Sequence, residues 1–189
     1  MTPARTIVIG ASAGAVQALL VLLPALPADF ALTVLVVVHV PPDRDNVLVP
    51  LLRAKCLLPV KEAEDKEPIA AGVIYFAPSD YHLLVEPDRT LALSADEPVN
   101  YSRPSIDVLF ESAADAYREE LVGVILTGAN HDGAAGLKAV ADAGGVAIVQ
   151  DSGEAYATAM PDAAREASPT ALTMNLDAIA SYLSSLETA

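Results

Sequence analysis

Short apolar runs alternate along the chain with segments whose apolar residues recur at helical spacing. Residues 6–9, 32–38 and 121–126 predict strands, because parallel strands buried on both faces appear as unbroken apolar runs. Residues 16–23 and 106–117 predict helices, the second with one apolar stripe. This alternation predicts an α/β fold, with a doubly wound, mostly parallel sheet flanked by helices.

The middle of the chain predicts an antiparallel hairpin extension of this sheet. Residues 82–86 and 90–94 flank Pro87-Asp88-Arg89, which is typical of a hairpin turn. Other expected strands are residues 60–64, 72–77 and 146–149, and other expected helices are residues 47–55, 134–143 and 176–186, with Ser105 and Asn175 as helix caps. No internal repeat or linker interrupts the pattern, so we expect residues 1–189 to form a single domain.

Composition and charge narrow the classes of function. With 53% hydrophobic and 5% aromatic residues, the 189-residue chain is suited to an aliphatic core rather than to disorder. The formal net charge of −14 argues against nucleic-acid binding and against an anionic membrane surface. A single cysteine, Cys56, allows no internal disulfide and no cysteine-based metal cluster. Since no signal peptide is apparent and the apolar run at residues 30–38 is far shorter than the roughly 20 residues of a membrane span, we expect a cytoplasmic protein without membrane insertion.

Three polar side chains follow predicted strands, at the sheet edge where ligands bind in open α/β folds. Ser12, His39 and Asp132 each lie at or just beyond the carboxyl end of one apolar run. A hydroxyl, an imidazole and a carboxylate at one edge are the catalytic groups of a serine hydrolase. Their order along the chain differs from the Ser, Asp, His order of α/β-hydrolases, so an ordinary member of that fold is not expected.

Ser12 lies in Gly10-Ala11-Ser12-Ala13-Gly14, which matches the Gly-x-Ser-x-Gly pattern of a nucleophile at a strand-to-helix turn. Gly10 would keep the turn free of clashes, Gly14 would let the helix start close to the strand, and the helix N-terminus would supply oxyanion donors. A phosphate-binding turn fits these small residues as well, which leaves a nucleotide-binding oxidoreductase as an alternative. That alternative lacks the complete Gly-x-Gly-x-x-Gly pattern and has His39 where an acidic residue is expected.

His39 and Asp132 also have purely structural interpretations. A lone histidine after an apolar run is more often a core residue, but Pro41-Pro42 ends this strand and brings His39 to the sheet edge, where it could take the Ser12 proton. Asp132, in a glycine-containing loop, is often only a turn former or a helix N-cap. As a catalytic residue, Asp132 would fix the imidazole tautomer and stabilise the protonated ring.

Longer motifs extend the pattern over nearly the whole chain. They are Gly-Ala-Ser-x-Gly at residues 10–14, His-x-Pro at 39–41, Ile-Tyr-Phe-Ala-Pro at 74–78, Arg-Pro-Ser-Ile-Asp-Val-Leu-Phe at 103–110 and Thr-Gly-x-x-x-Asp-Gly-Ala at 127–134. In this order and spacing, the chain resembles the catalytic domain of chemotaxis protein-glutamate methylesterases, the CheB family.

The resemblance implies an enzyme that hydrolyses glutamate γ-methyl esters, and in some members deamidates glutamines, on a methyl-accepting chemoreceptor or similar helical signalling protein. It implies Ser12 as nucleophile, His39 as base and acid, and Asp132 as the orienting carboxylate, with no cofactor and no metal. Weaker candidates for substrate or oxyanion contacts are Ala13, Gly14, His82, Arg103, Ala129 and Asn130.

Three of these weaker candidates depart from the family's usual motifs. Ala13 replaces a threonine, and Ala129 and Asn130 replace Met and Gly in the loop before Asp132. We expect Asn130 to preserve the loop because asparagine tolerates a left-handed backbone, and we expect His131 to face solvent. The departures motivate a second alternative, a catalytically weakened signalling module that binds receptor or partner helices.

His82 and Arg103 have competing interpretations. The resemblance places His82 near the substrate face, although a histidine at the start of a strand also packs structurally. Arg103 would contact an acidic receptor helix or form a surface salt bridge worth about 0–1 kcal/mol.

The family usually carries an N-terminal phosphorylatable receiver domain. We expect none in this chain, because only five residues precede the first predicted strand. The sequence is then either a fragment or a free-standing catalytic domain, whose activity would not depend on phosphorylation in cis.

Overall fold

The computed structural model describes residues 5–39 and 47–188, so the expected strand end at Pro41-Pro42 lies outside the described residues. The strands are β1 (Thr6–Ala11), β2 (Thr33–Val38), β3 (Val60–Glu62), β4 (Ile74–Phe76), β5 (His82–Val85), β6 (Leu91–Ser94), β7 (Leu121–Ile125), β8 (Val146–Gln150) and β9 (Leu172–Met174). The helices are α1 (Ala15–Leu22), α2 (Leu48–Arg53), α3 (Ile106–Tyr117), α4 (Ala134–Asp142), α5 (Ala159–Ala167) and α6 (Leu176–Ser184), with short 3₁₀ helices at Leu23–Ala25, Arg118–Glu120 and Ser185–Thr188.

Seven strands form one sheet in the order β3-β4-β2-β1-β7-β8-β9, and every neighbouring pair is parallel. The chain builds outward from the central strand β1 in both directions, which confirms the predicted doubly wound α/β class. The hairpin also forms, but β5 and β6 make a separate two-stranded antiparallel sheet. In contrast to the expected addition to the main sheet, these strands pair with each other and pack into the core on the face that α3 covers.

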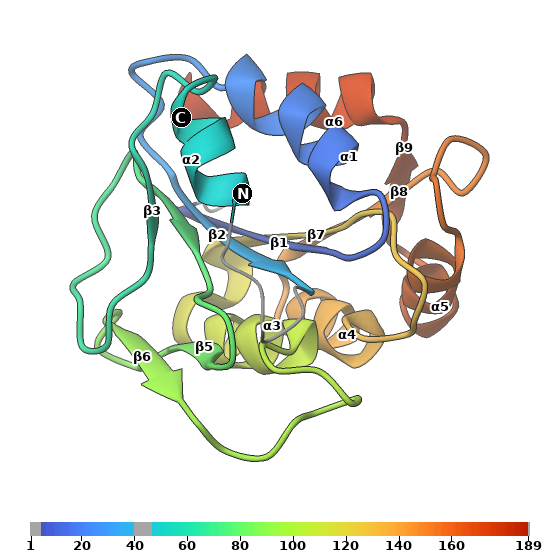
Figure 1. Cartoon of the computed structure of the whole chain (residues 1–189). Helices are drawn as coiled ribbons and strands as arrows, with labels where there is room; N and C mark the ends of the chain where they lie inside the picture. Colours follow the sequence, from blue (N-terminus) through green and yellow to red (C-terminus); the bar gives the residue numbers. More distant parts are fainter. Residues whose placement is uncertain (1–4, 40–46, 189) are drawn as a thin grey trace.

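Helices cover both faces of the main sheet. Helices α1, α2 and α6 lie on one face, and α3, α4 and α5 lie on the other together with the hairpin (Figure 1). Along β1, Ile7 and Ile9 pack into the core under α1, whereas Val8 packs into the core under α3. Burial on both faces is therefore the reason why this strand is an unbroken apolar run.

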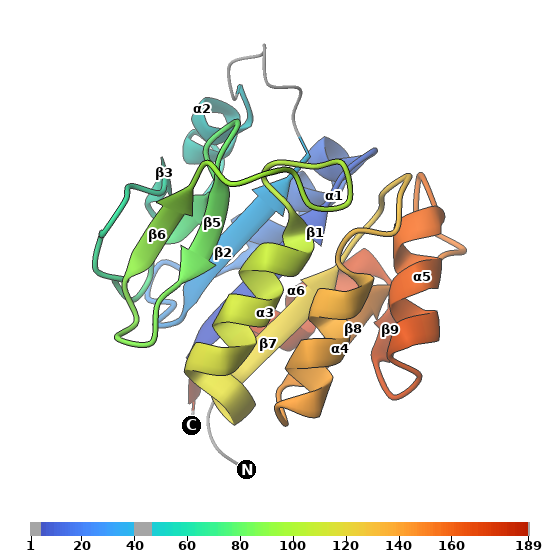
Figure 2. The same cartoon turned by 90° about the horizontal axis from the view of Figure 1, so that it is seen from below.

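The register of the three central strands brings their carboxyl ends to one edge of the sheet. Gly10 of β1 pairs with Val37 of β2 and with Ile125 of β7. Figure 2 shows the loop after β7 gathered at this edge with the segment that leads into α3. The residues that follow these strands are therefore neighbours, although they are far apart in sequence.

Gly10 lies within β1, against the first residue of α3. The turn begins only after Ala11, so the expected role of Gly10 in the turn is wrong. A Cβ at position 10 would lie 2.4 Å from Cγ2 of the buried Ile106. The glycine is needed because α3 crosses the strand at close range.

Replacing Gly10 with alanine is expected to lower the free energy of unfolding by about 1–3 kcal/mol, because the added methyl group overpacks the contact with Ile106. Urea unfolding measures the effect. Gly153→Ala is the matched control, since a Cβ there meets its nearest neighbour at 3.4 Å and the change should be close to neutral. Equal stability of the two variants would contradict the packing argument.

Candidate active site

Ser12 follows β1 and is held between the ends of the two neighbouring strands. Its backbone N–H donates to the Thr127 carbonyl beyond β7 (2.9 Å), while the N–H of His39, beyond β2, donates to the carbonyl of Ala11 (3.2 Å). The Ser12 carbonyl accepts from the N–H of Ala15, the first residue of α1 (2.9 Å). Ser12 thus occupies a strand-to-helix turn, and its Oγ makes no hydrogen bond within the described residues.

The turn between Ser12 and α1 offers backbone donors. Gly14, the N-cap residue of α1, has a φ of 85°, and a Cβ there would lie 2.7 Å from Cβ of Tyr156. Within residues 5–39 and 47–188, the N–H groups of Ala13 and Gly14 donate to no protein acceptor. Because they lie at the positive end of α1, these groups are suited to bind an oxyanion formed beside Ser12.

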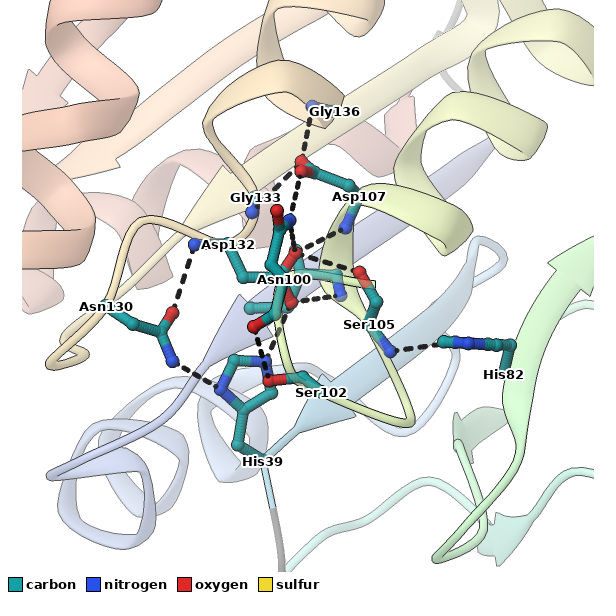
Figure 3. Close-up of polar contacts among 11 residues, drawn as sticks. His39, His82, Asn100, Ser102, Ser105, Asp107, Asn130, Asp132, Gly133 and Gly136 are labelled. Carbon is teal, nitrogen blue, oxygen red and sulfur yellow. Dashed lines mark hydrogen bonds and ion pairs between the residues drawn. The ribbon is translucent and has the colours of Figure 1, made fainter. Parts of the chain in front are cut away.

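His39 is contacted at both ring nitrogens (Figure 3). Its Nε2 lies 2.8 Å from Oδ2 of Asp132, and its Nδ1 lies 3.1 Å from Nδ2 of Asn130. The side chain is 13% exposed, so the ring lies close to the surface. The nitrogen that faces the carboxylate is the opposite one from the familiar serine-protease arrangement, in which Nδ1 bonds the aspartate.

Asp132 is fully buried, and every partner of its carboxylate is a donor. Oδ2 accepts from His39 and from the backbone N–H of Ile106 (2.7 Å). Oδ1 accepts from Nδ2 of Asn100 (2.8 Å), Oγ of Ser105 (2.8 Å) and the N–H of Asp107 (3.2 Å). Burial by itself raises the pKa of Asp132, but the hydrogen bonds, led by that of His39, outweigh it and hold the pKa below its usual value.

These bonds make Asp132 the anionic cap of α3. Ser105 is the N-cap residue, but its side chain bonds no backbone N–H and donates instead to Asp132. The expected capping by the Ser105 side chain is therefore wrong, because the carboxylate from the loop after β7 takes the first N–H groups of the helix. A negative charge at this position also complements the helix dipole.

A second buried carboxylate caps the neighbouring helix in return. Oδ1 of Asp107, in α3, accepts from the N–H groups of Gly133 (3.0 Å) and Gly136 (2.7 Å) at the start of α4. Nδ2 of Asn100 bridges Oδ2 of Asp107 (2.7 Å) to the carboxylate of Asp132. The pKa of Asp107 is raised mainly by the burial of its carboxyl group and also by the nearby charge of Asp132. The hydrogen bond from the Gly136 N–H opposes this rise.

The Thr127 hydroxyl ties together three loops around the site. It donates to the Ala13 carbonyl (2.8 Å) and accepts from the Ala157 N–H (2.9 Å). The Thr127 N–H donates to Oε1 of the buried Gln150 at the end of β8 (2.8 Å). The turn that carries Ser12, the loop that carries Asp132 and the segment before α5 are therefore held in register.

The loop before Asp132 differs from expectation at one residue. Asn130 was expected to preserve the loop by adopting a left-handed backbone conformation. Its φ is not positive, so it does not adopt that conformation. It acts through its side chain, whose Oδ1 accepts from the Asp132 N–H (3.0 Å). Ala129 and His131 are exposed, and His131 faces solvent as predicted.

His82 and Arg103 both make hydrogen bonds within the protein. His82 is buried; its Nε2 bonds the Glu97 carbonyl (3.0 Å) and its Nδ1 accepts from the Ser105 N–H (3.1 Å). The Arg103 guanidinium bonds Asp80 (2.7 and 3.1 Å) and two backbone carbonyls. These bonds give both residues the structural roles that were their competing interpretations: His82 supports the start of α3, and Arg103 joins two loops. A contact of either residue with a substrate stays a prediction.

Asn100, Ser105 and Asp107 are site residues that sequence reasoning did not identify as such. Ser105 and Asp107 belong to the Arg-Pro-Ser-Ile-Asp motif, so that motif was the available signal. Asn100 lies in a tight turn with φ values of 52° at Asn100 and 60° at Tyr101. Tyrosine rarely adopts such a conformation, so the local sequence gave no signal for this turn.

The described residues hold no group of three or more His, Cys, Asp or Glu side chains placed to bind a metal ion. Within the same ranges, no helix combines the length and the apolar character needed to cross a membrane. Burial raises the pKa of the Cys56 thiol to about 11, so this thiol stays protonated at neutral pH and is a poor nucleophile.

The fold and these side chains define a class of protein, the doubly wound α/β proteins with serine, histidine and aspartate gathered at the carboxyl edge of the sheet. The chain belongs to the CheB methylesterase family, whose model matches residues 7–183. This membership confirms the family predicted from the sequence motifs.

Relatives and a solved structure agree with this membership. A protein-glutamate methylesterase/protein-glutamine glutaminase of Symbiobacterium thermophilum is 40% identical over 173 residues, which cover 88% of this chain and 48% of that protein, about half its length. A Leptospira interrogans relative, given the same enzyme name provisionally, is 47% identical over 176 residues, which cover 93% of this chain and 91% of its own. The crystal structure of the Thermotoga maritima CheB methylesterase catalytic domain matches with a TM-score of 0.92 and 31% identity, over 98% of this chain and 100% of that one. The predicted enzyme class is thereby confirmed, and the oxidoreductase alternative is wrong.

Proposed function

We propose that the protein is a serine hydrolase of glutamate γ-methyl esters, with Ser12 as nucleophile, His39 as base and acid, and Asp132 as the carboxylate that orients the imidazole. The observation that carries this proposal is the hydrogen bond between His39 Nε2 and Asp132 at the strand ends beside Ser12. With Nε2 directed to the carboxylate, Nδ1 is the nitrogen that remains to exchange a proton with Ser12.

The first half of the reaction forms an acyl-enzyme. Ser12 Oγ attacks the ester carbonyl carbon and its proton passes to Nδ1 of His39, while the charge of Asp132 stabilises the imidazolium. The backbone N–H groups of Ala13 and Gly14 donate to the oxyanion. When the C–O bond to the methoxy group breaks, His39 returns the proton and methanol leaves.

The second half of the reaction releases the carboxylic acid. Water attacks the acyl carbon, gives its proton to His39 and yields a second oxyanion at the same backbone donors. Collapse breaks the bond to Ser12 Oγ, which takes the proton back. With a glutamine amide in place of the ester, the same steps would release ammonia instead of methanol.

The names of the relatives support the substrate class. Protein-glutamate methylesterases/protein-glutamine glutaminases are 36–40% identical to this chain over most of its length. We therefore assign as substrate a glutamate methyl ester or a glutamine side chain of a protein, and we propose a methyl-accepting chemoreceptor or similar helical signalling protein as the protein that carries it. The hydrolase is favoured over the binding module, because the His39–Asp132 pair and the donors beside Ser12 are intact despite the departures at Ala13, Ala129 and Asn130.

The test is methanol release from a methylated receptor fragment. We expect the protein to release methanol and to restore the unmodified glutamate, as read by the mass change of the receptor peptide. His39→Ala is the control for non-enzymatic hydrolysis. Absence of hydrolysis by folded protein that binds the same fragment would contradict the proposal in favour of a binding module.

A further inference from the structure

The Asn130 amide links the two residues of the His39–Asp132 pair (Figure 3). Its Oδ1 accepts from the backbone N–H of Asp132 (3.0 Å), and its Nδ2 lies 3.1 Å from Nδ1 of His39. The pairing of His39 Nε2 with Asp132 closes the ring of contacts. Asn130 is half-buried and belongs to the same loop as Asp132.

The orientation of this amide follows from donor and acceptor chemistry alone. The Asp132 N–H can only donate, so the oxygen of the Asn130 amide must face it. The NH₂ group therefore faces His39, and Nδ1 must carry a lone pair. The remaining ring proton is then on Nε2, where it donates to the carboxylate of Asp132.

The same contact also occupies the atom that the reaction needs. Nδ1 can accept one proton, and Asn130 donates to the same nitrogen to which the Ser12 hydroxyl must donate during acylation. Ser12 Oγ has no hydrogen-bond partner in the part of the chain that the structure describes. His39 therefore carries its ring proton on Nε2, as the general base requires, but its Nδ1 accepts a hydrogen bond from the Asn130 amide.

We infer that Asn130 is a positioning residue that holds His39 in the tautomer of a general base and yields Nδ1 to Ser12 when an ester enters the site. The inference rests on the proposed function, since it gives Asn130 a role in the same proton transfer. A single neutral hydrogen bond corresponds to about a 2- to 10-fold change in an equilibrium constant, so the exchange is easily reversible. Asn130 therefore sets the fraction of protein whose base is free.

Two substitutions at this position remove its donor: Asn130→Asp keeps an acceptor for the Asp132 N–H, whereas Asn130→Gly removes both groups. Asn130→Asp has nearly the same shape and still accepts from the Asp132 N–H, but it presents a carboxylate oxygen to Nδ1 and stabilises a proton there. We expect the rate of fluorophosphonate labelling at Ser12 to fall by about 10- to 1,000-fold. Asn130→Gly removes the competing donor, and we expect labelling to accelerate by about 2- to 10-fold.

Nitrogen-15 NMR of the histidine rings gives a readout that does not depend on activity. In the unsubstituted protein we expect His39, assigned by its loss in His39→Ala, to have a protonated Nε2 and an unprotonated Nδ1. Asn130→Asp should protonate Nδ1, whereas Asn130→Gly should leave Nδ1 unprotonated but without a donor, because the Asp132 carboxylate still accepts the proton of Nε2. His131→Ala, at the adjacent exposed residue, is the control and should leave both the spectrum of His39 and the labelling rate unchanged.

The outcomes distinguish this inference from the proposed function. A protonated Nδ1 in the unsubstituted protein, or equal labelling rates for Asn130→Asp and Asn130→Gly, would overturn the role of Asn130. Absence of Ser12 labelling in every variant would overturn the hydrolase proposal, and the NMR experiment would still decide the tautomer.

Discussion

Replacing Ser12 with alanine is expected to abolish fluorophosphonate labelling and to reduce ester hydrolysis by at least about 10⁴-fold. The change removes the only proposed nucleophile, whereas His39, Asp132 and the backbone donors stay in place. Because Ser12 Oγ bonds nothing within the described residues, the variant should keep the stability of the parent protein. Intact-mass analysis after labelling and methanol release measure the two effects.

Ser168→Ala is a matched control for this experiment. The Ser168 hydroxyl is buried and has no hydrogen-bond partner among the described residues, so its loss makes the same chemical change away from the site. We expect normal labelling and normal turnover. Activity of Ser12→Ala equal to that of Ser168→Ala would refute the nucleophile assignment.

Asp132→Asn is expected to reduce ester hydrolysis by about 10⁴-fold and, unlike Ser12→Ala, to destabilise the fold as well. All five groups around the carboxylate donate to it, so the NH₂ group of asparagine must face at least one other donor. If that donor is Nε2 of His39, the base tautomer is lost. The mismatch and the lost charge should lower the free energy of unfolding by about 2–4 kcal/mol.

The destabilisation by Asp132→Asn should depend on pH. The pKa of the Asp132 carboxyl is lower in the folded protein than in the unfolded chain, so its contribution to stability is complete above the unfolded value of about 4 and is lost as the pH falls through the folded value. The difference in unfolding free energy between parent and variant should be largest near pH 7 and shrink below about pH 4. A difference that does not change with pH, measured by urea unfolding, would show that the carboxylate charge contributes nothing.

The strands most plainly visible in the sequence are those with two buried faces. β1, β2 and β7 appear as apolar runs because each face packs under a layer of helices. The edge strand β9 (Leu172–Met174) was not predicted, since none of its three residues is fully buried. Helix α5 was also missed, because Pro161 lies in its first turn and Met160 is its only large apolar residue besides that proline.

The positions of Ser12, His39 and Asp132 and the pairing of His39 with Asp132 could be predicted, but the other residues that contact this pair could not. Strand ends are visible in the sequence, and the parallel register brings them to one edge. By contrast, the contact of Asn100 with Asp132 spans 32 residues and depends on how the segment before α3 crosses the sheet edge. Asn130 was noted as a departure from the family motif, yet its contact with His39 follows from tertiary placement.

The capping of α3 by Asp132 bears on how inactive relatives of this protein should be recognised. The first N–H groups of α3 need a buried acceptor whether or not an ester is ever hydrolysed. A descendant that lost the enzymatic activity would therefore remain under selection to keep the aspartate, while its serine would be free to drift. When related sequences are compared, a retained aspartate therefore indicates only that the fold is retained. Retention of the serine and the histidine indicates that the hydrolase activity is retained as well.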